Sequence, residues 1–353
     1  MKVAVVTCHN QPDYIRAVTL RQAVIAQRDI SPRIIKNRSR GILRYLEMML
    51  RVTWLRLRYN PDIYILTFRG YELLPFMTLI TVGKKLIYDE LINPIEWLQE
   101  ARTERWAKLI PQKPLKQFNR LLLSRCQTVI TDTAAHTDYV RKLMNLPAKL
   151  FVDLPVGTDE TMFHKKASAK SAKKGAFRVF YYGSMLPLHG LDIVLQAAEQ
   201  LTDFAITFTI IGGKRNMAER IADAQARGVH ITYKSYVPFS EIPSEIAKAD
   251  VCLAGPFGDT TQATHVLTGK AYQFLAAGAV TVIGQNKASS QFHNQKNALV
   301  VPLGNAKALA DTLRWAYTHQ GKLPAIAAAG HDTYSHYYSS TILAKKMAQI
   351  LQR

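Results

Sequence analysis

The chain is predicted to be an α/β protein with two doubly wound domains, each built on a parallel sheet. Apolar runs of strand length alternate with helix-length segments, the pattern of a parallel sheet covered by helices on both faces. The 353 residues, 48% of them hydrophobic, suffice for two domain cores of ordinary size. A polar, basic and aperiodic segment at residues 164–175 is typical of an exposed linker between two such domains.

The expected elements follow from short apolar runs bounded by polar or glycine-containing segments. In the first half we expect strands at residues 3–8, 62–67, 85–90 and 128–131, and helices at 12–26, 41–59 and 118–126. In the second half we expect strands at residues 178–182, 205–211, 230–234, 251–254, 280–283 and 298–301, with helices between them and further helices at 306–318 and 340–352. The predicted domains are residues 1–160 and 177–325, with a basic linker at 161–176 and a C-terminal helical segment at 326–353.

The formal net charge of +20 indicates an anionic partner, because few small-molecule enzymes carry so much charge of one sign. The three cysteines are far apart, which favours a reducing compartment and argues against zinc or a disulfide framework. The longest apolar run, residues 73–83, is about half of the roughly 20 residues that a spanning helix needs. The first residues turn polar too quickly for a signal peptide. We therefore expect a cytoplasmic protein, peripherally associated with the inner face of the membrane.

The segment at residues 41–59 carries an apolar and aromatic stripe at helical spacing beside regularly spaced arginines. Between residues 33 and 58 there are eight basic residues and one acid, Glu47. A second basic stretch, residues 105–125, holds six basic residues and no acid. A basic amphipathic helix with an aromatic residue is typical of membrane-surface contact. The membrane-contact residues predicted on this basis are Arg44, Arg51, Trp54 and Arg58. The alternative is a core helix with a solvated basic face.

Residues 250–283 form the most informative stretch, which predicts a strand, a polar loop, a helix and a second strand. Thr268 is a plausible N-cap and Gly278 stands where a helix C-cap belongs. A helix that starts beyond the carboxyl end of a strand offers bare N–H groups and a dipole to an anion. Lys270, directly after Gly269, adds a full positive charge in the first turn. This chemistry suits a nucleotide diphosphate, and the alternative is a solvated lysine at an ordinary helix start.

A second strand–turn–helix pattern lies upstream, at residues 179–198. Gly183 follows the strand, Ser184 comes next, and the pair His189-Gly190 opens the helix. A histidine at this place can donate to a phosphate, and a glycine permits close approach of the backbone. Gly212 and Gly213 end the next strand, where ordinary turn chemistry is the stronger interpretation and ligand contact the alternative.

Three segments together resemble retaining, GT-B-fold glycosyltransferases of the broad family 4 type. They are residues 129–159, 179–198 and 250–283, and the resemblance runs from about residue 126 to 305. The upstream segment, Pro-Leu-His-Gly at residues 187–190, is nearer to one sub-group of that family. The resemblance implies two Rossmann-like domains facing across a cleft. The C-terminal domain would hold a nucleotide-diphosphate sugar with UDP or GDP as the nucleotide, and the last helix would cross back to the N-terminal, acceptor-binding domain.

The resemblance also implies roles for single residues, although this chain departs from the family pattern. His265 and Gln273 stand where the family usually carries two glutamates, and Ser184 and His189 stand where it carries Arg and Lys. Gln273 would bond the donor ribose as a neutral partner, and His265 would stabilise the leaving phosphate. Tyr236 and Val237 would lie where the backbone reads the base, with a buried tyrosine as the alternative. The implied donor-binding residues are Gly183, Ser184, His189, Gly190, Gly212, Tyr236, Val237, Thr268, Gly269, Lys270 and Gln273.

Catalytic candidates in the first domain come from the ends of predicted strands. Asp89 and Glu90 end one strand and His9 follows the first one, so their side chains could orient an acceptor hydroxyl or take its proton. The alternative for the two acids is a loop pair without function. For the segment from Asp132 to His136, helix capping by Thr133 or Asp132 is the favoured interpretation. No Asp-x-Asp motif is present, so no metal is expected, and Lys270, His189 and helix dipoles would neutralise the phosphate charge.

The predicted function is therefore metal-independent, retaining transfer of a sugar from a nucleotide-diphosphate sugar to a lipid-linked glycan or glycolipid at the cytoplasmic face of the membrane. One alternative is a catalytically degenerate GT-B protein that binds a nucleotide or partner, because His265 and Gln273 depart from the family. The other is a basic nucleic-acid-binding protein, suggested by charge alone. No nucleic-acid partner is expected, since no motif of such a fold accompanies the charge.

Overall fold

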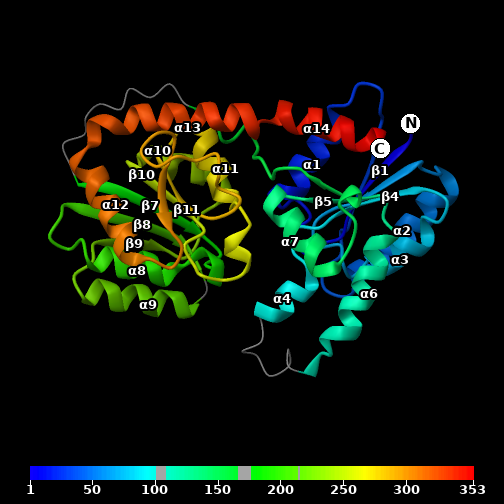
Figure 1. The fold of residues 1–353 in the computed structure, drawn as a ribbon, viewed down its shortest axis with the longest axis horizontal. Helices are drawn as coiled ribbons and strands as arrows, with labels where there is room; N and C mark the ends of the chain where they lie inside the picture. Colours follow the sequence, from blue (N-terminus) through cyan, green and yellow to red (C-terminus); the bar gives the residue numbers. More distant parts are fainter. Residues whose placement is uncertain (101–108, 166–175, 214) are drawn as a thin grey trace. The chain divides into compact units, whose positions relative to one another are not determined.

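The computed structural model describes residues 1–100, 109–165, 176–213 and 215–353 (Figure 1). The chain divides into two compact units: unit 1 comprises Met1–Gly157 and Ser340–Arg353, and unit 2 comprises Thr158–Ser339. Each unit holds a six-stranded sheet whose paired strands are parallel, so the predicted α/β class with two doubly wound sheets is confirmed. Of the predicted linker 161–176, residues 166–175 lie outside the described part of the chain.

The sheet of unit 1 has the strand order β2-β1-β3-β4-β5-β6. From β1 the chain first adds β2 on one side and then continues with β3 on the other side, so the switch point lies between β1 and β3. Its strands are β1 (Val3–Thr7), β2 (Arg33–Lys36), β3 (Ile63–Leu66), β4 (Lys85–Asp89), β5 (Thr128–Thr131) and β6 (Phe151–Asp153). Its helices are α1 (Ile15–Ile25), α2 (Leu43–Arg58), α3 (Leu74–Ile80), α4 (Pro94–Glu100), α6 (Gln112–Ser124), α7 (Ala134–Met144) and α14 (Ser340–Gln352).

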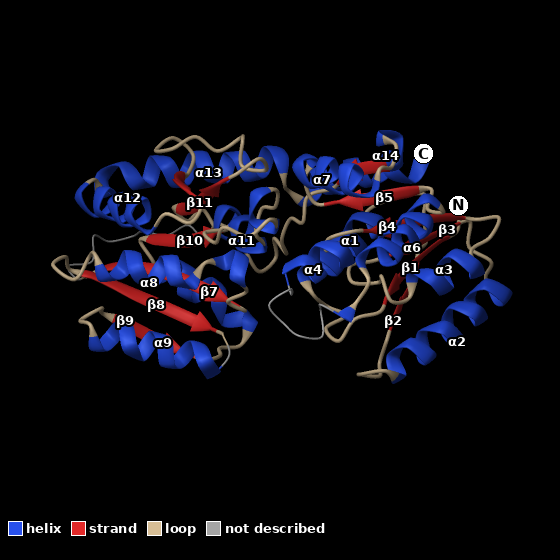
Figure 2. Cartoon of the chain, turned by 60° about the horizontal axis from the view of Figure 1, so that its bottom comes forward, coloured by secondary structure: helices blue, strands red, loops and turns tan. Residues whose placement is uncertain are grey.

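Strand β1 shows how this sheet is buried on both faces. Val3 and Val5 pack in one core with α1 and α14, whereas Ala4 and Val6 pack in another with α2, α3, α6 and α7. Successive side chains of a strand point to opposite faces, so a strand covered on both sides must be apolar at every position. Figure 2 shows the strands of this sheet with helices on either side.

The sheet of unit 2 has the order β12-β11-β10-β7-β8-β9, which reverses between β7 and β10. Its strands are β7 (Phe177–Gly183), β8 (Ile206–Gly212), β9 (Ile231–Lys234), β10 (Val251–Gly255), β11 (Thr281–Gln285) and β12 (Leu299–Pro302). Its helices are α8 (Leu191–Glu199), α9 (Arg215–Ala226), α10 (Ile242–Lys248), α11 (Gly269–Ala276), α12 (Ala306–Thr318) and α13 (Leu323–Tyr337).

Local signals explain several element ends. Gly278 follows α11 at φ +66°, the left-handed conformation that glycine adopts without strain, as the sequence predicted. Asn305 caps α12 by accepting a hydrogen bond from the backbone N–H of Ala308 at 2.9 Å. Helix α6 begins six residues before the predicted start, and Pro114 lies in its first turn, where a missing N–H costs no helical bond. Within the described residues, no helix has the length and apolar character needed to cross a bilayer.

Candidate functional site

The carboxyl ends of β7 and β10 form the switch point of the sheet in unit 2. These neighbouring strands begin the two halves of the sheet that run in opposite directions from the centre. Open α/β sheets bind ligands in the crevice outside the strand ends at such a point. The loop after β7 covers residues 184–190, and the loop after β10 covers residues 256–268. The two segments singled out in the sequence therefore meet at one place.

His189 and Lys270 converge on Gly183 from these two loops. A Cβ built on Gly183 would lie 3.6 Å from His189 Nδ1 and 3.6 Å from Lys270 Nζ. Within the described part of the chain, neither nitrogen has a hydrogen-bond partner. Two buried nitrogen atoms thus point to the same small volume with their hydrogen-bonding capacity unused, which is costly unless a ligand satisfies them.

Burial sets the charge state of both groups. Lys270 is 5% exposed, and burial lowers the pKa of its ammonium to about 7. Its Nζ lies 4.6 Å from the centroid of the Tyr181 ring. Burial, and then the charge of Lys270, lower the pKa of His189 well below its usual value, so this imidazole is neutral at pH 7. A buried ammonium in the first turn of a helix lacks a counter-charge from the dipole, and an anion would supply one.

The glycines around this site serve the packing of backbone against backbone. Gly190 has φ +67°, and a Cβ there would lie 2.5 Å from Gly258 N. A Cβ on Gly258 would in turn lie 2.2 Å from Pro187 O, and one on Gly212 would lie 2.3 Å from Gly183 O. Close approach of the backbone to a ligand was predicted for Gly190, and for Gly212 only as the alternative to turn chemistry. The structure gives both glycines a packing role, because neighbouring chain segments occupy the space that a side chain would need.

Thr268 stands at the N-cap position of α11, as predicted, but its side chain does not cap the helix. The hydroxyl donates instead to Ala254 O at 2.9 Å, which ties the helix start to the end of β10. The hydroxyl-capping expectation is therefore wrong. Because Thr268 Oγ1 does not accept from the first N–H groups of α11, Gly269 and Lys270 begin a helix whose start can receive an anion.

Gln273 lies one turn after Lys270 and is buried. Its Oε1 accepts a hydrogen bond from the Tyr182 hydroxyl, which comes from the end of β7. The Tyr182 ring stacks on Phe180 with centroids 5.6 Å apart. The amide is therefore held between α11 and β7, beside the site of His189 and Lys270.

His265 is buried and follows a short 3-10 turn, Gln262–Thr264. Asn286, after β11, holds the backbone on both sides of it by donating from Nδ2 to Ala263 O at 2.7 Å and to Val266 O at 2.9 Å. The sequence did not single out Asn286, because nothing in its neighbourhood along the chain indicates these distant carbonyls.

The remaining donor-side residues lie on the same carboxyl edge. Ser184 is exposed directly after β7. Tyr236 and Val237 follow β9, which is separated from β7 by β8. Tyr236 is 77% exposed, so the alternative of a buried tyrosine is wrong. The exposed ring remains available to a ligand at this edge.

In unit 1 the switch point lies between β1 and β3, and His9 stands there. Its backbone N–H donates to Asn37 Oδ1 at 2.9 Å, and its ring packs against Phe68 with centroids 5.4 Å apart. Burial lowers the pKa of His9, so the imidazole is mostly neutral near pH 7. His9 therefore stands at the edge of the sheet where open α/β sheets bind ligands.

Asp89 forms a buried ion pair with Arg16. Its carboxylate accepts from Arg16 Nη2 at 2.7 Å and from the backbone N–H of Phe68 at 3.1 Å, and Arg16 and Asp89 are both fully buried. Arg16 also donates to the carbonyl oxygens of Leu154 and Pro155. These contacts take up the charge and the lone pairs of the buried carboxylate, so it is not available to an acceptor hydroxyl. The structure therefore gives Asp89 a role in joining α1, β3 and β4, and we withdraw the catalytic role predicted for it.

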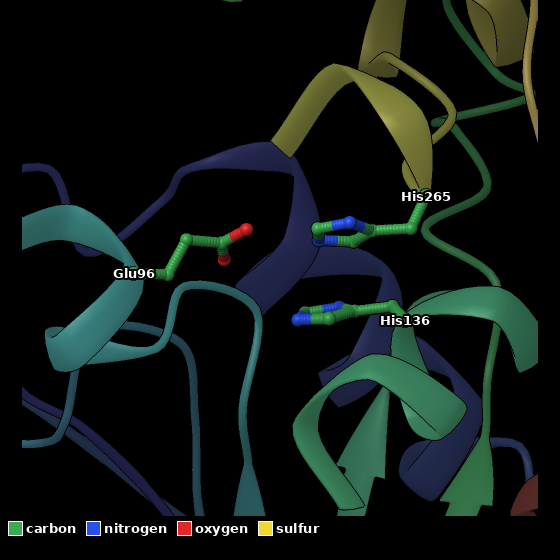
Figure 3. Close-up of side chains that lie close together, drawn as sticks. All are labelled: Glu96, His136 and His265. Carbon is green, nitrogen blue, oxygen red and sulfur yellow. The ribbon is translucent and has the colours of Figure 1, made fainter. Parts of the chain in front are cut away.

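Glu90, in contrast, faces a buried polar cluster at the ends of β4 and β5. Burial raises the pKa of Glu90 to about 7, and its Oε1 accepts a hydrogen bond from Asn93. Asp132 Oδ1 lies 2.6 Å from His136 Nδ1, and although burial opposes it, this carboxylate raises the pKa of His136. Figure 3 shows the side chains of Glu96, from α4, and His136, from α7, pointing toward each other. A carboxylate oxygen of Glu96 and a ring nitrogen of His136 lie within 4.8 Å of each other.

The helix-capping prediction for this segment is confirmed at Thr133. Thr133 Oγ1 accepts from the backbone N–H of His136 at 3.0 Å and caps α7. Asp132 instead pairs with the His136 ring, so capping is the wrong role for Asp132. The signal for the pair was the spacing of four residues at a helix start, where positions i and i+4 are neighbours. No local signal marks Glu96.

The four residues predicted to contact a membrane lie on α2 and differ in exposure. Trp54 is 65% exposed and Arg58 is exposed in the last turn. Arg44 donates to Asn10 Oδ1 and Gly41 O, and Arg51 donates to Glu47 and Lys36 O. The guanidinium groups of Arg44 and Arg51 therefore have partners within unit 1, which the spacing of seven residues did not reveal.

The site in unit 2 can thus bind a diphosphate through a lysine, a histidine and two helix starts. Residues 176–319 match the family model described as glycosyl transferases group 1. No curated protein sequence matches the chain significantly.

Similar solved structures cover nearly the whole chain. Sucrose-phosphate synthase from Thermosynechococcus elongatus has a TM-score of 0.78 at 13% identity, covering 100% of this chain and 98% of that one. Anabaena HepE, in complex with UDP and glucose, has a TM-score of 0.74 at 14% identity, covering 100% and 99%. A glycosyltransferase from Rickettsia africae has a TM-score of 0.71 at 12% identity, covering 99% and 97%. At such identities the likeness shows the fold, which is GT-B, and the family match assigns residues 176–319 of unit 2 to the glycosyl transferases of group 1.

Proposed function

We propose that the protein transfers a sugar from a nucleotide-diphosphate sugar to an acceptor hydroxyl. The observation that carries this proposal is the convergence of His189 Nδ1 and Lys270 Nζ at the switch point between β7 and β10, where both buried nitrogens lack a protein hydrogen-bond partner in the described residues. A diphosphate placed there would satisfy both groups and give Lys270 its counter-charge. The family match over residues 176–319 supports the same assignment.

The donor nucleotide is UDP or GDP, and UDP is the first to test. Complexes of HepE with UDP and with UDP-glucose support this order. Gln273, held by the Tyr182 hydroxyl, is the candidate partner of the ribose hydroxyls. Tyr236, exposed after β9, is the candidate contact of the base.

Transfer proceeds with retention of the anomeric configuration and without a metal ion. The bond between the sugar and the diphosphate breaks first, and the negative charge that develops on the leaving phosphate is stabilised by Lys270 and the start of α11. The acceptor hydroxyl attacks from the same face of the sugar, and the leaving phosphate oxygen takes its proton. No side-chain base is required at the donor site in this sequence of steps.

The acceptor is a lipid-linked glycan or a glycolipid at the cytoplasmic face of the membrane. The net charge of +20 supports a reaction at an anionic membrane surface. His9, at the switch point of unit 1, and Glu90, beside the Asp132–His136 pair, are the candidates that orient the acceptor hydroxyl. Helix α2 presents Trp54 and Arg58 to the outside of the same unit.

Nucleotide-sugar turnover tests the proposal directly. UDP and GDP are compared by thermal shift, and hydrolysis of their glucose and N-acetylglucosamine conjugates is then followed with and without a membrane lipid extract. We expect stabilisation by a nucleoside diphosphate, faster release of UDP or GDP with the extract, and a product with the donor's anomeric configuration by NMR. Binding without turnover on any acceptor would instead favour a nucleotide-binding GT-B protein, the alternative suggested by Gln273 and His265. A product of inverted configuration would refute retention.

A further inference from the structure

Helix α2 carries two apolar stripes, one buried and one exposed. Met48, Val52 and Leu55 are at most 3% exposed and pack in the core of unit 1. The outer stripe is 59% to 80% exposed and consists of Leu43, Leu46, Leu50, Trp54 and Leu57. At about 100° per residue the two stripes lie on roughly opposite sides of the helix. A surface helix needs one apolar stripe, so the second requires another apolar environment.

The exposed stripe continues onto α3. Leu79 is 74% exposed and Val82, just after the helix, is 70% exposed. Helices α2 and α3 contact each other on the same face of the sheet, as Figure 1 also shows. Arg56 Nη2 donates to Val82 O at 3.1 Å, which holds this turn at the C-terminal end of α2. The outer stripe of α2 together with Leu79 and Val82 is named the apolar ridge below.

The charged side chains of α2 and of the segment before it are almost all positive. Glu47 is the one acid between residues 33 and 58. Its carboxylate turns to the protein, where it accepts from the backbone N–H groups of Arg38 and Ser39 at 2.7–3.0 Å and from Arg51 at 2.9 Å. Arg58 is exposed in the last turn of α2. The stretch therefore offers its partner apolar side chains flanked by cations.

We propose that the apolar ridge inserts into the interfacial layer of an anionic membrane. The inference rests on the proposed function and adds the surface through which the enzyme reaches a lipid acceptor. A second copy of the chain is a poorer partner, because a symmetric contact through the ridge would bring two sets of arginines together. A bilayer surface accepts leucines, places a tryptophan at the headgroup level and attracts the flanking cations.

The experiment uses the full chain and vesicles of phosphatidylcholine with and without phosphatidylglycerol. Binding is measured by co-sedimentation, and insertion by quenching of tryptophan fluorescence with lipids brominated on the acyl chain. The test variant is Leu50→Ser/Leu57→Ser. The matched control is Ile25→Ser, which also replaces an exposed apolar side chain (53% exposed) but lies on α1, on the other face of the sheet. Thermal shift with UDP is run on every protein.

We expect binding to anionic vesicles, with quenching that disappears in Trp54→Phe. The double variant should bind at least 100-fold more weakly, about tenfold for each leucine, and the control should bind as the wild type does. Equal binding of the double variant and the wild type would overturn the inference. The inference would also be overturned if the wild type self-associated without vesicles, as measured by light scattering, and the double variant did not. These results leave the UDP response and the turnover of nucleotide sugars in place, whereas a missing UDP response, or binding without turnover, would count against the proposed glycosyl transfer and leave vesicle binding intact.

Discussion

Replacing Lys270 by Met should weaken nucleotide-diphosphate binding and abolish its dependence on pH above 7. The free protein holds Nζ buried beside the Tyr181 ring, and burial lowers the pKa of the ammonium to about 7. A bound diphosphate favours the charged form and raises this pKa again. Between pH 7 and the pKa in the complex, nucleotide binding must therefore take up a proton, and the affinity falls as the pH rises.

The magnitude follows from linkage. One pKa unit corresponds to 1.36 kcal/mol, so the dissociation constant should rise about tenfold per pH unit above pH 7.5. Loss of one charge-assisted contact should cost about 1.5–3 kcal/mol at pH 7, which is roughly 10- to 150-fold in affinity. Methionine keeps the length and apolar stem of lysine, so the packing around Tyr181 is preserved. The nucleotide's own phosphate titrates near pH 6, below this window.

The assay is calorimetric titration with UDP at pH 8, in two buffers of different ionisation enthalpy. Wild-type binding should take up nearly one proton, and Lys270→Met should take up none. The control is Lys307→Met, a lysine whose side chain is 81% exposed, which should behave as the wild type does. The same pH dependence in wild type and Lys270→Met, or no proton uptake by the wild type, would refute the reasoning.

Four further predictions concern nucleotide binding in unit 2 and two buried acids in unit 1. UDP or GDP should stabilise the protein without divalent metal, and a thermal shift that appears only with Mg²⁺ or Mn²⁺ contradicts this. Gln273→Glu should tighten nucleotide binding by up to ~1–2 kcal/mol in a titration, because the ribose would gain a charged acceptor, and unchanged affinity would remove this residue from the donor site. Asp89→Ala should lower the free energy of unfolding in urea by about 3–5 kcal/mol, since Arg16 would stay buried without its counter-charge, and a loss below 1 kcal/mol would show that the pair is not structural. Glu90 has a pKa raised to about 7, so wild-type stability should fall as the pH rises from about 4.5 to 7, by roughly 3 kcal/mol, and Glu90→Gln should remove this fall. Parallel pH profiles of the two proteins would count against the last prediction.

Much of the secondary structure was predictable, because strands buried on both faces are short apolar runs. Val251–Gly255 and Ala306–Thr318 agree with the predicted elements to within a residue. The short edge strand Arg33–Lys36 was missed, because its basic ends and mostly exposed side chains lack that apolar character. Leu323–Tyr337 lies largely within the predicted helical segment 326–353 but was not predicted as a helix with bounds of its own; the residues that it buries, such as Ile326 and Tyr334, are widely spaced among small and polar residues.

The candidate donor site was predictable where local chemistry marks it. A glycine turn after a strand and a lysine in the first turn of a helix are local patterns, so Gly183, His189 and Lys270 were identified from the sequence alone. Side-chain partners far along the chain were not. Arg16 and Asp89 are 73 residues apart and Tyr182 and Gln273 are 91 apart, and no periodicity connects such positions.

By itself the sequence determined the α/β class, two parallel sheets and the loops that meet at the switch point of unit 2, because local patterns of burial and turns encode them. The glycosyltransferase type of unit 2 came from the resemblance of its segments to a known family. Only the tertiary structure decided how single side chains are used. Asp89 is neutralised by Arg16, the Thr268 hydroxyl turns away from its helix, and the apolar stripe from Leu43 to Leu57 faces outward. The physical reason is that a periodic stripe specifies which residues share a face, whereas the packing of distant segments selects which face is covered.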